Sequence, residues 1–363
     1  MAGSGTTLIA AQSKGHQAIG FDRDPLAVAM AKVWCSRPNL KQIEKATSAV
    51  ITDAKKWRTI PLSSAYPDGA DEETKAFVRY WFDDTNRRQL SALSRAIDNQ
   101  GNAPTRAVLW CALSRLIITK VRGVSLAMDV SHSRPHKTYH RAMIHPLDKF
   151  VSSVNTILKM IPGQCSSAPS ARVQLGDARK LPIGNNTVNL VITSPPYLDA
   201  IDYLRGHKFS LVWMGYSISE LRAIRATNIG RTISRTNECD VLRYLEVVNK
   251  MTHADSLSTR TRGMLCNYVH DMEGAVREIA RVLVPGGKAL FVIGDSMVRG
   301  SFIKNSSAIT ELAQLHGLAV TARRSRILPS NRRYLPPPTL SSSGAKLQSR
   351  MRNEVLISTE KTG

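Results

Sequence analysis

The chain has 363 residues, of which 42% are hydrophobic, so it is long enough for one large domain with an insertion or for two domains. Fifty Lys and Arg residues against 28 Asp and Glu residues give a net charge of +22, which favours a polyanionic partner, most commonly nucleic acid. The five cysteines are widely spaced without a C-x-x-C pair, which argues against a disulfide framework or a zinc knuckle and favours the reducing cytoplasm. No apolar run approaches the ~20 residues of a membrane span, so no membrane partner is expected.

A glycine-rich turn opens the chain and precedes a helix that we expect to end at Gly15. The two glycines of this turn allow the backbone to approach a ligand closely, and the helix N-terminus behind them offers N–H groups. The turn consists of Ala2, Gly3, Ser4, Gly5 and Thr6.

A short strand over residues 18–22 follows and ends in Asp22, after which Asp24 and Pro25 begin a second helix. The acid closes the strand about 17 residues after the glycine turn, where it is positioned to accept hydrogen bonds from ribose hydroxyls.

The long segment that follows is expected to be mainly helical, with helices over residues 41–50, 72–99 and 105–120. A cationic stretch at residues 131–141 comes after them. Its three histidines have the spacing of metal ligands, but Pro135 breaks the helix that would align them, so phosphate contact is favoured over a metal site. This segment is therefore a candidate for DNA docking and target recognition.

The chain then returns to strands. Residues 172–175 are followed by Asp177, and residues 188–193 are expected to form a buried parallel strand. Ser194, Pro195, Pro196 and Tyr197 end that strand, at the edge where open α/β sheets bind ligands.

These four residues have the chemistry to hold a flat base that carries an exocyclic amine. Ser194 and the Pro195 carbonyl are hydrogen-bond acceptors for the two amine hydrogens, and Tyr197 can stack on the ring. The alternative is a simple strand-ending turn, because Pro-Pro is ordinary in turns.

The C-terminal part predicts a further sheet. A helix over residues 268–283 leads through a Pro-Gly-Gly turn into a strand at 289–295, and residues 318–328 and 354–359 are expected to pair antiparallel. Before them, Arg222, Arg225, Arg231 and Arg235 lie in a segment rich in Thr, Ser and Asn, which is typical of a phosphate-binding surface.

Three motifs together resemble the S-adenosylmethionine-dependent amino-methyltransferases of nucleic acids, and most of all the DNA cytosine-N4 methyltransferases. Residues 2–7 (AGSGTT) resemble that family's cofactor loop, residues 19–25 (IGFDRDP) its acidic second-strand motif, and residues 193–197 (TSPPY) its catalytic motif. The resemblance implies an α/β fold, a Rossmann-like doubly wound methyltransferase sheet with a helical insertion. It implies S-adenosyl-L-methionine as cofactor and DNA as substrate.

The same resemblance assigns roles to residues. The cofactor would be bound by Asp22, Asp177 and the turn residues Ala2, Gly3, Ser4, Gly5 and Thr6, and the catalytic residues would be Ser194, Pro195, Pro196 and Tyr197. Residues 1–34 would begin the cofactor-binding domain, residues 35–170 would be the insertion, and residues 171–363 would complete the domain.

The chain departs from the family pattern in two ways. Met1 stands where the family has the Phe of Asp-Pro-Phe, so the family's first strand is expected to be missing. A start codon placed too late, a fragment of a longer gene and a partner polypeptide that supplies the strand all remain open. The cofactor loop also precedes the catalytic motif, whereas the commoner cytosine-N4 order is the reverse.

The reaction we expect is direct transfer of a methyl group to the N4 amine of a flipped cytosine, as in restriction-modification or orphan modification, with a restriction endonuclease as a further candidate partner. None of the cysteines follows a proline, which argues against carbon-5 methylation. Adenine-N6 methylation, RNA amine methylation of the guanine-N2 type and a decayed DNA-binding remnant remain alternatives.

Overall fold

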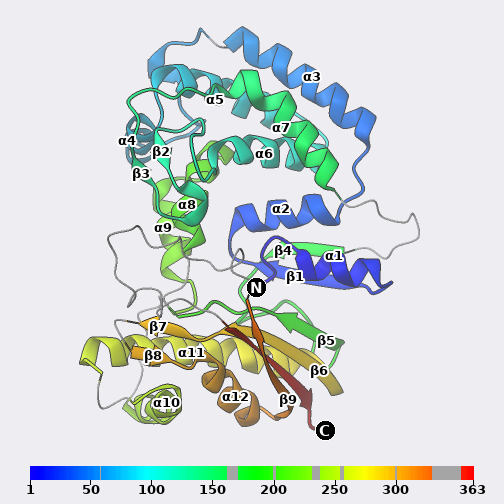
Figure 1. Ribbon diagram of the computed structural model, residues 1–363. Helices are drawn as coiled ribbons and strands as arrows, with labels where there is room; N and C mark the ends of the chain where they lie inside the picture. Colours follow the sequence, from blue (N-terminus) through cyan, green and yellow to red (C-terminus); the bar gives the residue numbers. More distant parts are fainter. Residues whose placement is uncertain are drawn as a thin grey trace. The chain divides into compact units, whose positions relative to one another are not determined.

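The computed structural model describes residues 1–57, 59–161, 171–198, 202–230, 238–253, 257–298, 301–328 and 353–363. The chain forms two compact units. One, here called the sheet unit, comprises Met1 and residues 176–200 and 226–363. The other, here called the helical unit, comprises residues 2–175 and 201–225. Figure 1 labels the elements of both.

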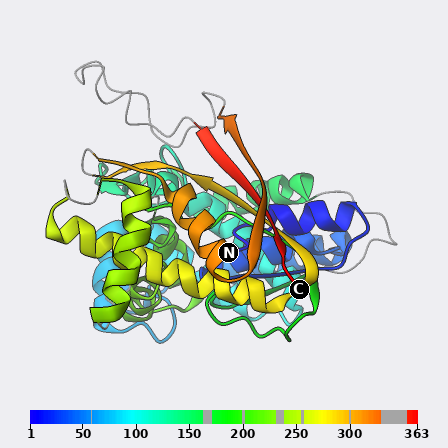
Figure 2. The same ribbon diagram turned by 90° about the horizontal axis from the view of Figure 1, so that it is seen from below.

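A four-stranded sheet forms the centre of the sheet unit, in the order β5-β6-β10-β9. Strand β5 (Val188–Thr193) runs parallel to β6 (Leu283–Gly294), and β10 (Asn353–Lys361) is antiparallel to both β6 and β9 (Leu318–Ile327). Figure 2 shows β9 and β10 side by side as the two terminal strands. The predicted antiparallel pairing of the last two strands is confirmed.

Two helices pack on this sheet, α11 (Thr259–Val282) and α12 (Asn305–Leu315), and α10 (Glu238–Met251) packs on both of them. Their apolar side chains and the strand residues Phe291 and Ile357, both 0% exposed, form one core. A small hairpin of β7 (Ser296–Val298) and β8 (Ser301–Ile303) completes the unit.

The helical unit contains a parallel pair of strands, β1 (Ala18–Asp22) and β4 (Ala171–Leu175). Helices α1 (Thr6–Ser13) and α2 (Pro25–Cys35) pack beside this pair. The predicted strand and the two flanking helices are thus present. Asp24 caps α2, accepting from the backbone N–H of Leu26 at 2.9 Å and of Ala27 at 3.3 Å, which explains why the helix begins at Pro25.

The remaining elements of the helical unit are mostly helices around a large apolar core that includes Phe82, Phe150 and Trp213. In chain order they are α3 (Leu40–Trp57), η1 (Leu62–Ser64), α4 (Glu72–Trp81), α5 (Asp84–Asp98), α6 (Ala103–Ile117), β2 (Ala127–Met128), η2 (Val130–His132), β3 (His136–Lys137), α7 (Pro146–Met160), α8 (Tyr203–Leu211), η3 (Val212–Met214) and α9 (Ile218–Ala226).

The α/β class expected from the sequence is confirmed, because parallel strand pairs alternate with helices in both units. The single helix predicted over residues 72–99 is wrong. It is two helices, because Asp83 caps α5 by accepting from the Asn86 backbone N–H at 2.8 Å, and a cap of this kind starts a new helix.

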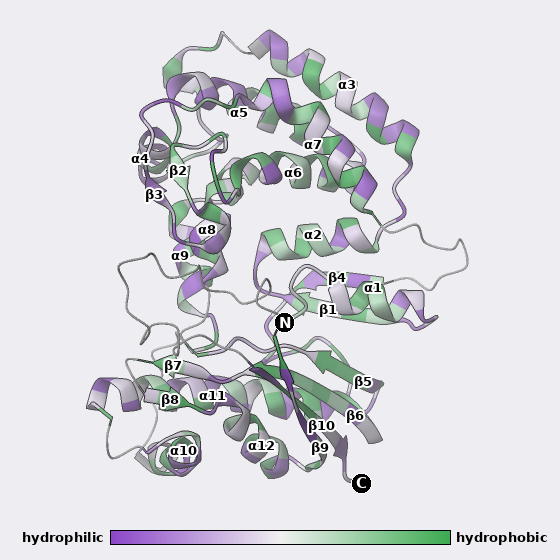
Figure 3. Cartoon of the chain, viewed as in Figure 1, coloured by the Kyte–Doolittle hydropathy of each residue, from purple (hydrophilic) through white to green (hydrophobic). Residues whose placement is uncertain are grey.

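Strand β5 lies where it was predicted but is not buried. Leu190 is 53% exposed and Ile192 is 40% exposed, and β5 is the edge strand of the four-stranded sheet. Figure 3 shows hydrophobic colour along this strand. The Pro-Gly-Gly turn lies within β6 and shifts the register of its pairing with β5. Val188 pairs with Leu283, whereas Leu190 pairs with Lys288.

Candidate functional site

Ser194, Pro195, Pro196 and Tyr197, here called the tetrad, follow directly on β5 in the sheet unit. The Ser194 side chain is exposed, and its Oγ lies 3.2 Å from the Tyr197 hydroxyl. Because the prolines fix φ near −65°, the backbone between these two side chains has little freedom. The predicted serine and tyrosine are therefore brought together at the carboxyl end of the strand.

A buried tyrosine of α11 holds the tetrad from behind. The hydroxyl of Tyr268 donates to the Pro196 carbonyl oxygen at 3.1 Å. Tyr268 is 1% exposed, and burial raises the pKa of its hydroxyl, so it stays a protonated donor at neutral pH. The tetrad thus has a fixed backbone anchor that sequence analysis missed, since nothing in the spacing of residues 196 and 268 indicates the contact.

A carboxylate from the last strand anchors the other side of the tetrad. The Tyr197 hydroxyl donates to Glu354 Oε1 at 3.3 Å, and Glu354 Oε2 accepts from Arg326 Nε at 2.9 Å and from its terminal nitrogen at 2.6 Å. Glu354 is 8% exposed and is therefore a buried acid paired with an arginine. Its contacts restrict the orientations of the Tyr197 ring.

The glycine turn lies in the helical unit and is tied to the predicted acid. The backbone N–H of Gly3 donates to Asp22 Oδ2 at 2.8 Å, and Asp22 Oδ1 accepts from the Asp24 N–H at 3.0 Å. Gly3 has φ +54° and Gly5 has φ +90°, a left-handed region that favours glycine. The glycine turn and Asp22, which are predicted to share a cofactor site, are thus in direct contact.

Gly5 is required for a second reason. A Cβ at this position would lie 2.9 Å from Cβ of Ala31 on α2, whereas nothing lies within 4 Å of one at Gly3. The turn therefore packs closely on a helix at Gly5 and is open at Gly3. This arrangement leaves room for a ligand beside Gly3. The other predicted cofactor-binding residues of the turn, Ala2, Ser4 and Thr6, lie near Gly3 along the chain.

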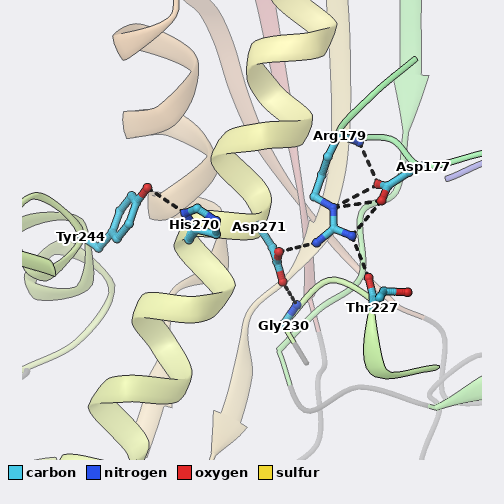
Figure 4. Close-up of polar contacts among 7 residues, drawn as sticks. All are labelled: Asp177, Arg179, Thr227, Gly230, Tyr244, His270 and Asp271. Carbon is cyan, nitrogen blue, oxygen red and sulfur yellow. Dashed lines mark hydrogen bonds and ion pairs between the residues drawn. The ribbon is translucent and has the colours of Figure 1, made fainter. Parts of the chain in front are cut away.

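Asp177 belongs to the sheet unit and is engaged by an arginine (Figure 4). Arg179 spans both carboxylate oxygens, with its Nε 3.0 Å from Oδ1 and a terminal nitrogen 2.8 Å from Oδ2. The same guanidinium contacts Asp271, which is 1% exposed, and donates to the Thr227 carbonyl at 2.8 Å. Asp177 above all, followed by Asp271, raises the pKa of Arg179.

Two of the arginines expected to bind phosphate, Arg231 and Arg235, lie outside the described residues. Among the described residues there is no cluster of three or more His, Cys, Asp or Glu side chains arranged to hold a metal ion. The helices of that same part of the chain include none that is long and apolar enough to cross a membrane.

The chain is similar in sequence to the type II methyltransferase M.BsoBI of Geobacillus stearothermophilus. The two are 23% identical over 370 residues, which cover 86% of this chain and 70% of that protein. No model of a known protein family matches this chain.

Solved structures give weaker similarity. TTHA0409 of Thermus thermophilus, a proposed DNA modification methylase whose structure has been determined with S-adenosyl-L-methionine, is 17% identical and matches 52% of each chain with a TM-score of 0.25. The match thus spans about half the length of that protein. A SAM-dependent methyltransferase of Methanosarcina mazei is 9% identical, with 59% of this chain and 78% of that chain covered and a TM-score of 0.27. Scores this low add nothing to the sequence similarity.

Proposed function

We propose that this protein is an S-adenosyl-L-methionine-dependent DNA methyltransferase that modifies an exocyclic amine, with cytosine N4 as the favoured target. The observation that carries the proposal is the similarity to a type II methyltransferase over 86% of the chain. The TSPPY segment at the end of a strand and the glycine turn tied to Asp22 support it, because both have the chemistry the reaction needs.

The residues of the glycine turn fit the proposed cofactor. Open space beside Gly3 allows close approach to the backbone, and the Asp22 carboxylate closes β1 as an acceptor for ribose hydroxyls. Asp177 is the proposed acceptor for the adenine amine, which would share the carboxylate with Arg179. S-adenosyl-L-methionine, when bound, supplies an electrophilic methyl group.

The tetrad would hold the base. An exocyclic amine is a poor nucleophile because its lone pair conjugates with the ring. Acceptance of its two hydrogens by Ser194 Oγ and the Pro195 carbonyl would draw the nitrogen towards tetrahedral geometry and free the lone pair. Tyr197 would stack on the flipped base, and Glu354 limits the orientations of its ring through the hydroxyl. Tyr268 holds the Pro196 backbone in place while the base is bound.

Two partner proteins are also proposed. They are a restriction endonuclease and a polypeptide that adds a strand to the sheet. The exposure of Leu190 and Ile192 on the edge strand β5 supports the second, because apolar edges of this kind accept a further strand.

The proposal is tested by incubating the chain with tritiated S-adenosyl-L-methionine and, in separate reactions, duplex DNA and tRNA, then digesting the labelled product to nucleosides. We expect label in DNA as N4-methylcytosine. Label in N6-methyladenine would keep the reaction class and replace the base, and label confined to tRNA would replace the substrate. DNA binding without any transfer or cofactor affinity would indicate a decayed enzyme and contradict the proposal.

A further inference from the structure

A cavity of about 460 Å³ lies entirely within the helical unit, between α4, α8 and α9. Its inner wall is apolar and includes Phe77, Leu204 and Leu221, of which the two leucines are each 4% exposed. The cavity contains Arg222 and Arg225, two of the arginines expected to bind phosphate, and none of the cofactor-loop or tetrad residues.

Cations surround the apolar wall. Four basic side chains line the cavity: Arg205, Lys208, Arg222 and Arg225. Two of them have acidic partners, since Arg225 pairs with Asp202 and Arg222 with Glu73.

Arg205 and Lys208 differ from these two, because none of the ion pairs found among the described residues includes either of them. The four cations and two acids leave a charge of about +2 at this place.

The positive charge of this cavity lies close to its apolar wall. Lys208 is half-buried with its Nζ 5.1 Å from the centre of the Phe77 ring. Burial, and then the charges of Arg225 and Arg205, lower the pKa of Lys208. An anion stabilises a lysine that is held among like charges. Binding of an anion therefore lowers the electrostatic free energy of this site.

The shape of the cavity indicates which anion. Arg205 is exposed and Lys208 is half-buried about one turn further along α8, so an anion bound here would meet both donors on one face of that helix. Arginine and lysine are the usual donors to backbone phosphates, and the apolar wall matches the face of a deoxyribose. A free carboxylate has no apolar face of this kind to pack against that wall.

We propose that this cavity binds a backbone phosphodiester of the DNA substrate, with Arg205 and Lys208 as its donors. The inference rests on the proposed function, since it takes DNA as the substrate. It adds a docking point in the helical unit, separate from the residues that would contact the cofactor or the base.

The test compares two double variants of the full chain. Arg205→Gln with Lys208→Met removes both positive charges while it keeps an unbranched side-chain stem at each position. The matched control, Lys149→Gln with Lys159→Met, removes two exposed lysines of α7 in the same unit, which lines no part of this cavity. Affinity for a fluorescein-labelled DNA duplex is measured by anisotropy between about 50 and 200 mM salt, and circular dichroism verifies that each variant is folded.

We expect the cavity variant to bind DNA about tenfold more weakly and the slope of log affinity against log salt to fall by about one, whereas the control changes affinity less than about twofold. Equal affinity and slope in the two variants would overturn the proposal, and so would a wild-type chain that does not bind DNA. The assay needs no methyl transfer. DNA binding with the expected slope change but without transfer would support the cavity and contradict the proposed function.

Discussion

The glycine turn and the tetrad are both held through their backbones, but by groups of opposite kind. At the turn, a carboxylate, Asp22, accepts from the N–H of Gly3 at 2.8 Å. At the tetrad, a hydroxyl, that of Tyr268, donates to the carbonyl of Pro196 at 3.1 Å. The turn needs residues without a Cβ, and the tetrad needs residues whose rings fix φ.

The two kinds of anchor leave different groups available to a ligand. At the turn, the Asp22 carboxylate accepts from the Gly3 N–H. The acceptor sites that this carboxylate has left favour hydroxyl donors such as those of a ribose. Fixing a carbonyl from behind leaves the tetrad with Ser194 Oγ and the Pro195 carbonyl as acceptors for an amine. The turn should therefore be sensitive to added side-chain atoms, and the tetrad to the loss of a single donor.

The largest effect is expected from Gly5→Ala. The new Cβ would lie 2.9 Å from Cβ of Ala31 at a φ of +90°, so steric overlap adds to backbone strain. We expect the free energy of unfolding to fall by about 3 kcal/mol and affinity for S-adenosyl-L-methionine to fall more than about tenfold. Chemical denaturation and calorimetric titration measure the two quantities.

Gly15→Ala is the matched control for that change. Gly15 also has a left-handed φ, +81°, but nothing lies within 4 Å of a Cβ there. It should cost about 1 kcal/mol and leave cofactor affinity unchanged. Equal losses in the two variants would show that the contact with Ala31 plays no part.

A smaller effect is expected from Tyr268→Phe, which removes only the hydroxyl that reaches Pro196. Loss of one buried hydrogen bond should reduce stability by about 1 kcal/mol and kcat by up to about tenfold, with the KM for S-adenosyl-L-methionine unchanged. Steady-state kinetics of methyl transfer measure kcat and the KM for S-adenosyl-L-methionine separately.

The control for this variant is Tyr244→Phe. The Tyr244 hydroxyl lies 2.9 Å from Nδ1 of His270 on the same helix, α11, that carries Tyr268, and Figure 4 shows that hydrogen-bonded pair. The same hydroxyl donates to Glu273 Oε2 at 2.9 Å and accepts from Arg243 at 3.2 Å, so its loss should cost at least as much stability as that of Tyr268 without lowering kcat. A drop in kcat shared by both tyrosine variants would mean that general loosening of the helix, and not the tetrad contact, is responsible.

The smallest effect concerns the loop before β5. Arg281 donates to both oxygens of Glu278 at 2.8 Å, and Glu278 accepts from the Leu181 N–H at 2.7 Å. These contacts, the arginine first, lower the pKa of Glu278.

A carboxyl whose folded pKa lies below its unfolded value stabilises the protein above the unfolded pKa and loses that effect as pH falls through the folded pKa. Glu278→Gln should therefore cost about 0.5 kcal/mol at pH 7 and progressively less as pH falls through the folded pKa of Glu278, as measured by thermal unfolding. A cost that does not change with pH would contradict the assignment.

Local patterns predicted the elements that carry the candidate site. Strand β5 follows from its apolar residues and the two prolines that end it, and the turn at Gly3 lies within hydrogen-bond distance of Asp22, with which it is predicted to share a cofactor site. Both depend on residues close in the sequence or on a spacing common to many α/β folds.

Contacts between distant residues could not be predicted in this way. The sequence separation is 72 residues for Tyr268 and Pro196 and 157 for Tyr197 and Glu354. The spacing of such pairs is set by packing of the whole unit, not by any local period. The break between α4 and α5 was missed because apolar residues recur at helical spacing on both sides of it, although Asp83 and the weak helix formers after it favour a cap.

The most direct test of the central claim is methyl transfer to DNA by the wild-type chain and by Ser194→Ala, with cofactor affinity measured for both. We predict a loss of about 100-fold in kcat with unchanged affinity for S-adenosyl-L-methionine, because one acceptor of the base amine is removed far from the glycine turn in sequence. Full activity in Ser194→Ala, or label at carbon 5 of cytosine, would contradict the account.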